Sequence, residues 1–158
     1  MINNRKLQDK IRKNNRRLMR KSFDLCVNRL IAFDSYQILP VEESDKRLYY
    51  YKSLSVKKIY SYRDSMDNFD RLKCFFDINK FIPKYLNLLA PDNYSYFFGI
   101  VEINGFRGIK QQYLKKEEPL FHFYDELGDN QLVLDIYEES SSYYYDIELF
   151  GDRWIITL

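Results

Sequence analysis

The chain has 158 residues, which suits one domain and is long enough to bury a hydrophobic core. Aromatic residues make up 18% and hydrophobic residues 46% of it, a composition that argues against a disordered chain. The net charge of +2 conceals a gradient, because residues 1–30 hold ten Lys/Arg and two Asp/Glu whereas residues 117–158 hold one and eleven. This asymmetry predicts a basic arm or an acidic binding surface, unless the two ends neutralise each other within one fold.

The beginning of the chain predicts a long helix. From Met19 to Ile31 apolar residues recur every three or four positions, so we expect a helix over residues 5–33 with one buried stripe. Upstream of Met19, Lys and Arg fill most positions. Residues 1–20 are therefore expected to form an exposed basic helical arm that frays. Pro40 then marks a turn.

Residues 46–63 carry a mixed pattern. Apolar and aromatic residues alternate there with period two, which favours a strand, but the lysine-rich composition is also compatible with a helix. Helical spacing returns over residues 65–78, with Asp64 or Ser65 as the capping residue. A proline suits the first turn of a further short helix over residues 83–89.

From residue 93 onward the pattern changes to period two. The dipeptide Asn104-Gly105 predicts a hairpin with a type I′ turn, which would place Glu102 opposite Arg107. Further strands are expected over residues 120–127, 131–139, 143–150 and 153–158. The sequence therefore predicts an α+β fold in a single domain, residues 1–158, with N-terminal helices followed by an antiparallel meander over residues 93–158.

The last strands sort their side chains onto two faces. A two-residue turn at Gly151-Asp152 would bring one set of residues into the core: Tyr145, Ile147, Leu149, Trp154, Ile156 and Leu158. The preceding strand would add Leu132, Leu134 and Ile136. The opposite side, which we call the tyrosine–acid face, carries Asp135, Tyr137, Glu139, Tyr144, Asp146 and Glu148.

Two interpretations of the tyrosine–acid face stay open. It can be a solvated face kept acidic for solubility, although like charges close together on a sheet are mildly destabilising. It can also bind a basic protein partner, because tyrosine rings anchor a contact while carboxylates pair with Lys and Arg. Proteins that act on nucleic acids are basic, so an inhibitor of a nuclease is one protein that would use such a face.

The basic arm offers an alternative site. Its cationic side chains would follow a phosphate backbone, and each contact would add salt-sensitive affinity. No RNP, zinc-finger or helix-turn-helix signature accompanies it. The candidate nucleic-acid-binding residues are Lys10, Arg12, Lys13, Arg16, Arg17 and Arg20.

Catalytic signatures are missing from the sequence. It contains no GxSxG, P-loop, GxGxxG or HExxH pattern. The single histidine, His122, alternates with phenylalanines on an expected strand and is interpreted as structural, and no second ligand stands at a zinc-binding spacing. We predict that the protein is not an enzyme and uses no metal or cofactor. A small enzyme that depends on His122 is the competing possibility.

Cysteine use and hydropathy predict the compartment. Cys26 and Cys74 form no CxxC pair, and we expect two buried or half-buried thiols in a reducing environment. The N-terminus has no apolar segment typical of a secretory signal, and the longest apolar run, residues 96–101, is too short to span a bilayer. These features predict a cytoplasmic protein without membrane contact.

The segment NQLVLDIYEESSSYYYDIELFGDRWIITL, residues 130–158, resembles the end of many small bacterial immunity proteins, which protect cells against contact-dependent growth inhibition and related polymorphic toxins. The likeness lies in acidic, aromatic strands and in a tryptophan in the last of them, here Trp154. It implies a protein that binds a cognate toxin domain, such as a nuclease, and blocks its active site. Many such proteins are acidic overall, whereas this chain has a pI near 8.4, so either the tyrosine–acid face or the basic arm would meet the toxin.

Overall fold

All strand pairs in the described part of the chain are antiparallel, and seven strands form one sheet. The computed structural model describes residues 4–8, 10–11, 14, 27–89, 100–110 and 120–158. The strands in spatial order are β2 (Ser35–Ile38), β5 (Ile100–Asn104), β4 (Tyr85–Leu89), β7 (Leu120–Tyr124), β8 (Gln131–Glu139), β9 (Ser142–Phe150) and β3 (Lys58–Ser65). A separate two-stranded sheet joins β1 (Ile31–Ala32) to β6 (Gly108–Ile109). The predicted α+β class is confirmed, and the meander holds for β7, β8 and β9.

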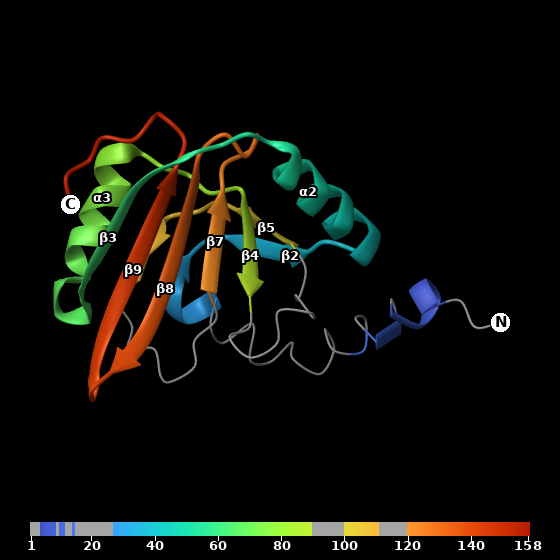
Figure 1. Cartoon of the computed structure of the whole chain (residues 1–158), viewed down its shortest axis with the longest axis horizontal. Coiled ribbons are helices and arrows are strands. Elements are labelled where there is room, and N and C mark those ends of the chain that lie inside the picture. The colour runs from blue at the N-terminus through green and yellow to red at the C-terminus, as the bar shows by residue number, and fades with distance from the viewer. Residues whose placement is uncertain (1–3, 9, 12–13, 15–26, 90–99, 111–119) are drawn as a thin grey trace.

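Two helices cover opposite faces of the large sheet. α2 (Val41–Ser53) packs Tyr51 flat against Tyr124 of β7, with ring centroids 3.8 Å apart. α3 (Asp70–Asn79) packs Phe76 edge-on against the neighbouring Phe123, at 6.1 Å. Adjacent residues of a strand point to opposite sides, so the helices lie on opposite faces. Figure 1 shows α3 beside β3 and β9, and α2 at the other end of the sheet.

The face under α3 is the core, and period-two alternation supplies it. The inward residues of β8 and β9 are at most 3% exposed, as predicted: Leu132, Leu134, Ile136, Tyr145, Ile147 and Leu149. Each fully buried side chain of this kind contributes roughly 1.5–3 kcal/mol relative to an exposed one. Ser140 and Ser141, with φ of 52° and 66°, make the two-residue turn between the strands, so Glu139 lies opposite Ser142.

The expected helix boundaries are partly right. The helix predicted over 65–78 is a 3-10 turn, η1 (Met66–Asn68), followed by α3, and the Ser65 hydroxyl caps η1 by accepting from the Asp67 amide at 3.2 Å. The first helix ends earlier than expected, since residues 27–30 are helical and Ile31 begins β1. Residues 46–63 contain both alternatives, because α2 ends at Ser53 and β3 begins at Lys58.

The short helix predicted over residues 83–89 is wrong. Tyr85–Leu89 is β4, which pairs with β5 on one side and β7 on the other. Leu86 points into the core, while Tyr85 and Asn87 lie on the other face. Two neighbouring strands determine this conformation, and the segment's own helical pattern is overridden.

The Asn104-Gly105 hairpin is also wrong. β5 pairs with β2 and β4, whereas β6 pairs with β1, so Glu102 lies opposite Gln37 and Tyr85 instead of Arg107. Gly105 does have a positive φ of 69°, but it turns the chain between two sheets. A Cβ at this position would collide with the Asp34 side chain, so the glycine allows a close approach as well as the turn.

The terminal segment is not a strand, because β3 occupies the edge of β9 that residues 153–158 would have used. Trp154 still enters the core, where it is 8% exposed and its ring lies 4.8 Å from Phe81 and 5.6 Å from Phe75. Its Nε1 donates to the Phe150 carbonyl at 2.9 Å. Ile156 is 41% exposed instead of buried. Cys74 is likewise exposed, against expectation, because it lies on the outer side of α3; Cys26 falls outside the described residues.

We predict that Trp154→Ala lowers the free energy of unfolding by about 3–5 kcal/mol, the usual cost of removing a buried aromatic ring. Urea denaturation would measure the loss. The neighbouring Ile155 is 57% exposed, so Ile155→Ala serves as the control and should change stability by less than about 0.5 kcal/mol. Equal effects of the two substitutions would contradict a stabilising role for the buried Trp154 ring.

Candidate functional site

The structure gathers the predicted tyrosine–acid face on one side of the β8–β9 hairpin. Asp135 lies directly opposite Asp146, and Tyr137 lies opposite Tyr144. The two tyrosine rings stack with centroids 5.9 Å apart. Glu139 and Glu148 complete the face toward the tip and the base of the hairpin. The prediction that these six side chains share one side of the sheet is therefore confirmed.

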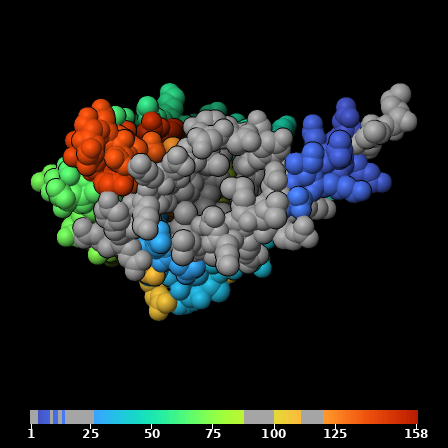
Figure 2. All heavy atoms as spheres, turned by 90° about the horizontal axis from the view of Figure 1, so that it is seen from below, coloured from blue at the N-terminus to red at the C-terminus, as the bar shows by residue number. Residues whose placement is uncertain are grey.

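The tip of the hairpin extends beyond the neighbouring strand. β7 pairs with residues 131–134 of β8, so residues 135–139 have β9 on one side and no strand partner on the other within the described ranges. Figures 1 and 2 show the hairpin at the opposite end of the molecule from the described residues of the N-terminal arm.

β3 brings a cation onto this acidic surface. The Arg63 guanidinium donates from Nε to Asp146 Oδ1 at 3.0 Å and from Nη2 to Oδ2 at 3.4 Å, and Nη1 lies 4.0 Å from a Glu139 oxygen. It also lies over the Tyr137 ring, 5.3 Å from its centroid. Lys58 pairs in the same way with Glu148, at 3.9 Å. The face therefore combines carboxylates and rings around a bound guanidinium.

Sequence reasoning missed Arg63. The signal was present in the stretch KIYSYRDS, residues 58–65, where Tyr60 and Tyr62 alternate with Ser61 and Arg63. Period two places the arginine on the side opposite the tyrosines. What the pattern does not contain is the neighbour of this strand, because β3 and β9 are about eighty residues apart in the chain.

Among the residues that the structure describes, Asp135 is the carboxylate of this face that has no cationic partner. It is half-buried, and in the described part of the chain no hydrogen bond or ion pair holds it. Burial, and next the neighbouring Asp146 charge, raise the pKa of Asp135 above its usual value. Burial and the hydrogen bond from its hydroxyl to Asp146, 2.9 Å long, raise the pKa of Tyr137 to about 12. An external cation beside Asp135 would relieve the repulsion between the two aspartates.

His122 is held by neutral groups. Its Nε2 lies 2.8 Å from Gln131 Oε1, and its Nδ1 lies 3.1 Å from the Tyr124 hydroxyl. Gln131 uses its amide nitrogen to donate to the Gly128 carbonyl, so its oxygen is free to accept from Nε2. Burial lowers the pKa of His122 to about 4. These contacts explain the histidine as a structural residue, and the described ranges contain no cluster of three His, Cys, Asp or Glu that could hold a metal.

We predict that this histidine makes stability depend on pH. Its folded pKa lies below the ordinary value of 6.5, so the unfolded chain takes up a proton first as the pH falls. The contribution of the neutral His122 to the free energy of unfolding is complete well above pH 6.5. It declines as the pH falls, and about 2 kcal/mol of it is lost at pH 5. Urea unfolding of His122→Asn should show a smaller loss between pH 7 and pH 5 than the parent chain. Identical pH profiles would contradict the low pKa.

Most of the basic arm lies outside the described residues. This applies to Arg12, Lys13, Arg16, Arg17 and Arg20. Lys10 is described, and it is exposed on a helical segment. In the ranges that are described, no helix combines the length and apolar character needed to cross a bilayer.

No protein-family model matches the chain, and no curated protein or solved structure is significantly similar to it.

Proposed function

We propose that the chain is a bacterial cytoplasmic immunity protein, which binds a cognate toxin domain through the tyrosine–acid face and blocks its active site. The observation that supports this most is the way Arg63 is held. A guanidinium lies over Tyr137 while two of its nitrogens meet Asp146, a geometry typical of arginine recognition at protein interfaces. The face can thus accommodate cationic side chains, and Asp135, which has no partner among the described residues, offers a further position for one.

The shape of the hairpin supports the same proposal. Its tip carries stacked tyrosines beyond the end of β7, while β3 flanks Tyr144 on the other side, so the β8 edge of the tip has no neighbouring strand in the described ranges and can enter a groove of a partner. Nucleases line such grooves with Lys and Arg, because their substrates are polyanions. The carboxylates would steer the encounter and discriminate between related toxins, since a mismatched charge is costly at an interface. Catalytic chemistry plays no part in this mechanism.

The first test is co-purification of the tagged chain with the product of the gene immediately upstream, the candidate toxin. We expect a stoichiometric complex that survives about half-molar salt, where exposed charge pairs alone are screened. Glu139→Lys and Asp135→Asn should each weaken binding by about tenfold or more, because a partner's cation loses its carboxylate.

The matched control is Asp152→Lys. Asp152 is exposed and lies beyond the base of β9, about 30 Å from the hairpin tip at the usual rise per residue. The Asp152→Lys substitution should leave the affinity for the candidate toxin unchanged. If the control weakens binding as much as Glu139→Lys, the contact depends on overall charge and the tyrosine–acid face is not the site. Recovery of nucleic acid at low salt, lost on deleting the basic arm (residues 1–20), would support the arm as the binding site instead.

A further inference from the structure

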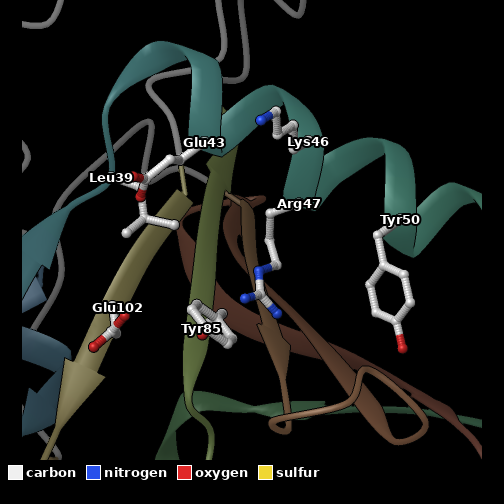
Figure 3. A pocket seen from close by; sticks show the side chains of 7 residues that line it. All are labelled: Leu39, Glu43, Lys46, Arg47, Tyr50, Tyr85 and Glu102. Atoms are coloured by element: carbon white, nitrogen blue, oxygen red, sulfur yellow. The ribbon is translucent and has the colours of Figure 1, made fainter.

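A second candidate site, which unlike the hairpin is concave, lies on the other half of the same sheet face, between α2 and strands β4 and β5. The cleft has a volume of about 470 Å³, within the range of small-molecule sites. Figure 3 shows its lining, which consists of Leu39, Glu43, Lys46, Arg47, Tyr50, Tyr85 and Glu102. Apolar, cationic and acidic side chains therefore meet in one place.

Helix α2, which forms one wall of the cleft, is fixed to the sheet by hydrogen bonds of Ser44. The Ile100 amide of β5 donates to the Ser44 hydroxyl of α2 at 3.1 Å, and this hydroxyl donates to the Leu39 carbonyl at 3.2 Å. Ser44 is 1% exposed, so both bonds are shielded from water. The cleft is preformed, which lowers the entropic cost of binding a small ligand.

Arg47 places its guanidinium inside the cleft, where it also lies 6.0 Å from the Tyr51 ring centroid. It extends from α2 toward Tyr85, with its guanidinium carbon 4.1 Å from the ring centroid (Figure 3). Glu43 lies one helical turn earlier, the spacing at which a carboxylate and a guanidinium usually pair. No ion pair joins the two here, and among the described residues no carboxylate lies within ion-pair distance of Arg47. Its stacking on Tyr85 holds the two charges apart across the cleft.

The acidic side of the cleft faces Arg47. Glu43 extends from α2 near Leu39, and Glu102 stands on β5 below them (Figure 3). Lys84 lies 3.6 Å from Glu102, so that carboxylate is partly neutralised. In the described ranges Glu43 has no cationic partner. The carboxylates of Glu43 and Glu102 thus lie on one side of the cleft, together with Lys46 and Leu39, and the Arg47 guanidinium lies on the other side over the buried Tyr85 (Figure 3).

We propose that this cleft binds a free zwitterionic amino acid. The carboxylate would lie against Arg47, the ammonium group between Glu43 and Glu102, and the side chain along Leu39 and the tyrosine rings. Such a ligand would pair with the Arg47 guanidinium and with the Glu43 carboxylate at the same time. A simple anion would use only the cationic end and gain nothing from Glu43. The site is independent of the hairpin contact with a toxin, and either proposal can fail without the other.

The test begins with the full chain and each of the twenty L-amino acids at about 10 mM in a thermal-shift assay, since a ligand that binds the folded state raises Tm. The best ligand is then compared by calorimetry with two analogues, one lacking the ammonium group and one lacking the carboxylate. We expect each analogue to bind at least about tenfold more weakly than the amino acid, because one charged contact is lost.

Variants assign the two ends of the cleft. Arg47→Gln and Glu43→Gln should each weaken the binding of the amino acid by about tenfold or more. Lys52→Gln, on the same helix but outside the cleft, should leave binding unchanged. Glu43→Gln should not weaken the binding of the analogue that lacks the ammonium group. A variant whose fold is damaged would lose binding of both ligands. The proposal is overturned if none of the twenty amino acids raises Tm, or if the deaminated analogue binds as well as its parent.

Discussion

The pairing of β8 with β9 is the constraint on which the rest of the structure depends. Nine residue pairs in one antiparallel register sort the side chains of both strands, apolar to one side, tyrosine and acid to the other. A slip of one residue would move the apolar set into solvent. The buried side of this pair carries the core under α3, and its other side is the tyrosine–acid face. Core and candidate site are therefore two consequences of one register.

The cost of this register is a row of like charges, and the third strand offsets it. Asp135 and Asp146 face each other directly, an arrangement that is destabilising on a bare sheet. β3 lies beside β9 and places Arg63 against Asp146, so one member of the pair is neutralised within the fold. The other member keeps its raised pKa and its open position. A cation from a binding partner would therefore neutralise Asp135, as Arg63 already neutralises Asp146.

The two candidate sites lie on different halves of the sheet but share one kind of contact. In each, an arginine lies over a tyrosine ring, Arg63 over Tyr137 and Arg47 over Tyr85. The first arginine is paired with carboxylates and lies on an open hairpin, which suits a protein surface. The second has no carboxylate partner in the described part of the chain and lies in a cleft, which suits a small ligand. Pairing and concavity, more than residue type, distinguish the two proposals.

The sequence by itself determined the elements whose signal is local. Period and capping alone predict strands β8 and β9, their buried residues, the composition of the tyrosine–acid face, the Ser65 cap of η1, and α3. Only the tertiary structure decided that Tyr85–Leu89 is a central strand, that Asn104-Gly105 joins two sheets, and that Trp154 packs without a strand around it. It also decided that Arg63 neutralises Asp146 and that Arg47 turns away from Glu43. Each of these depends on a neighbour distant in the chain or on competition for a partner, which no short stretch of sequence contains.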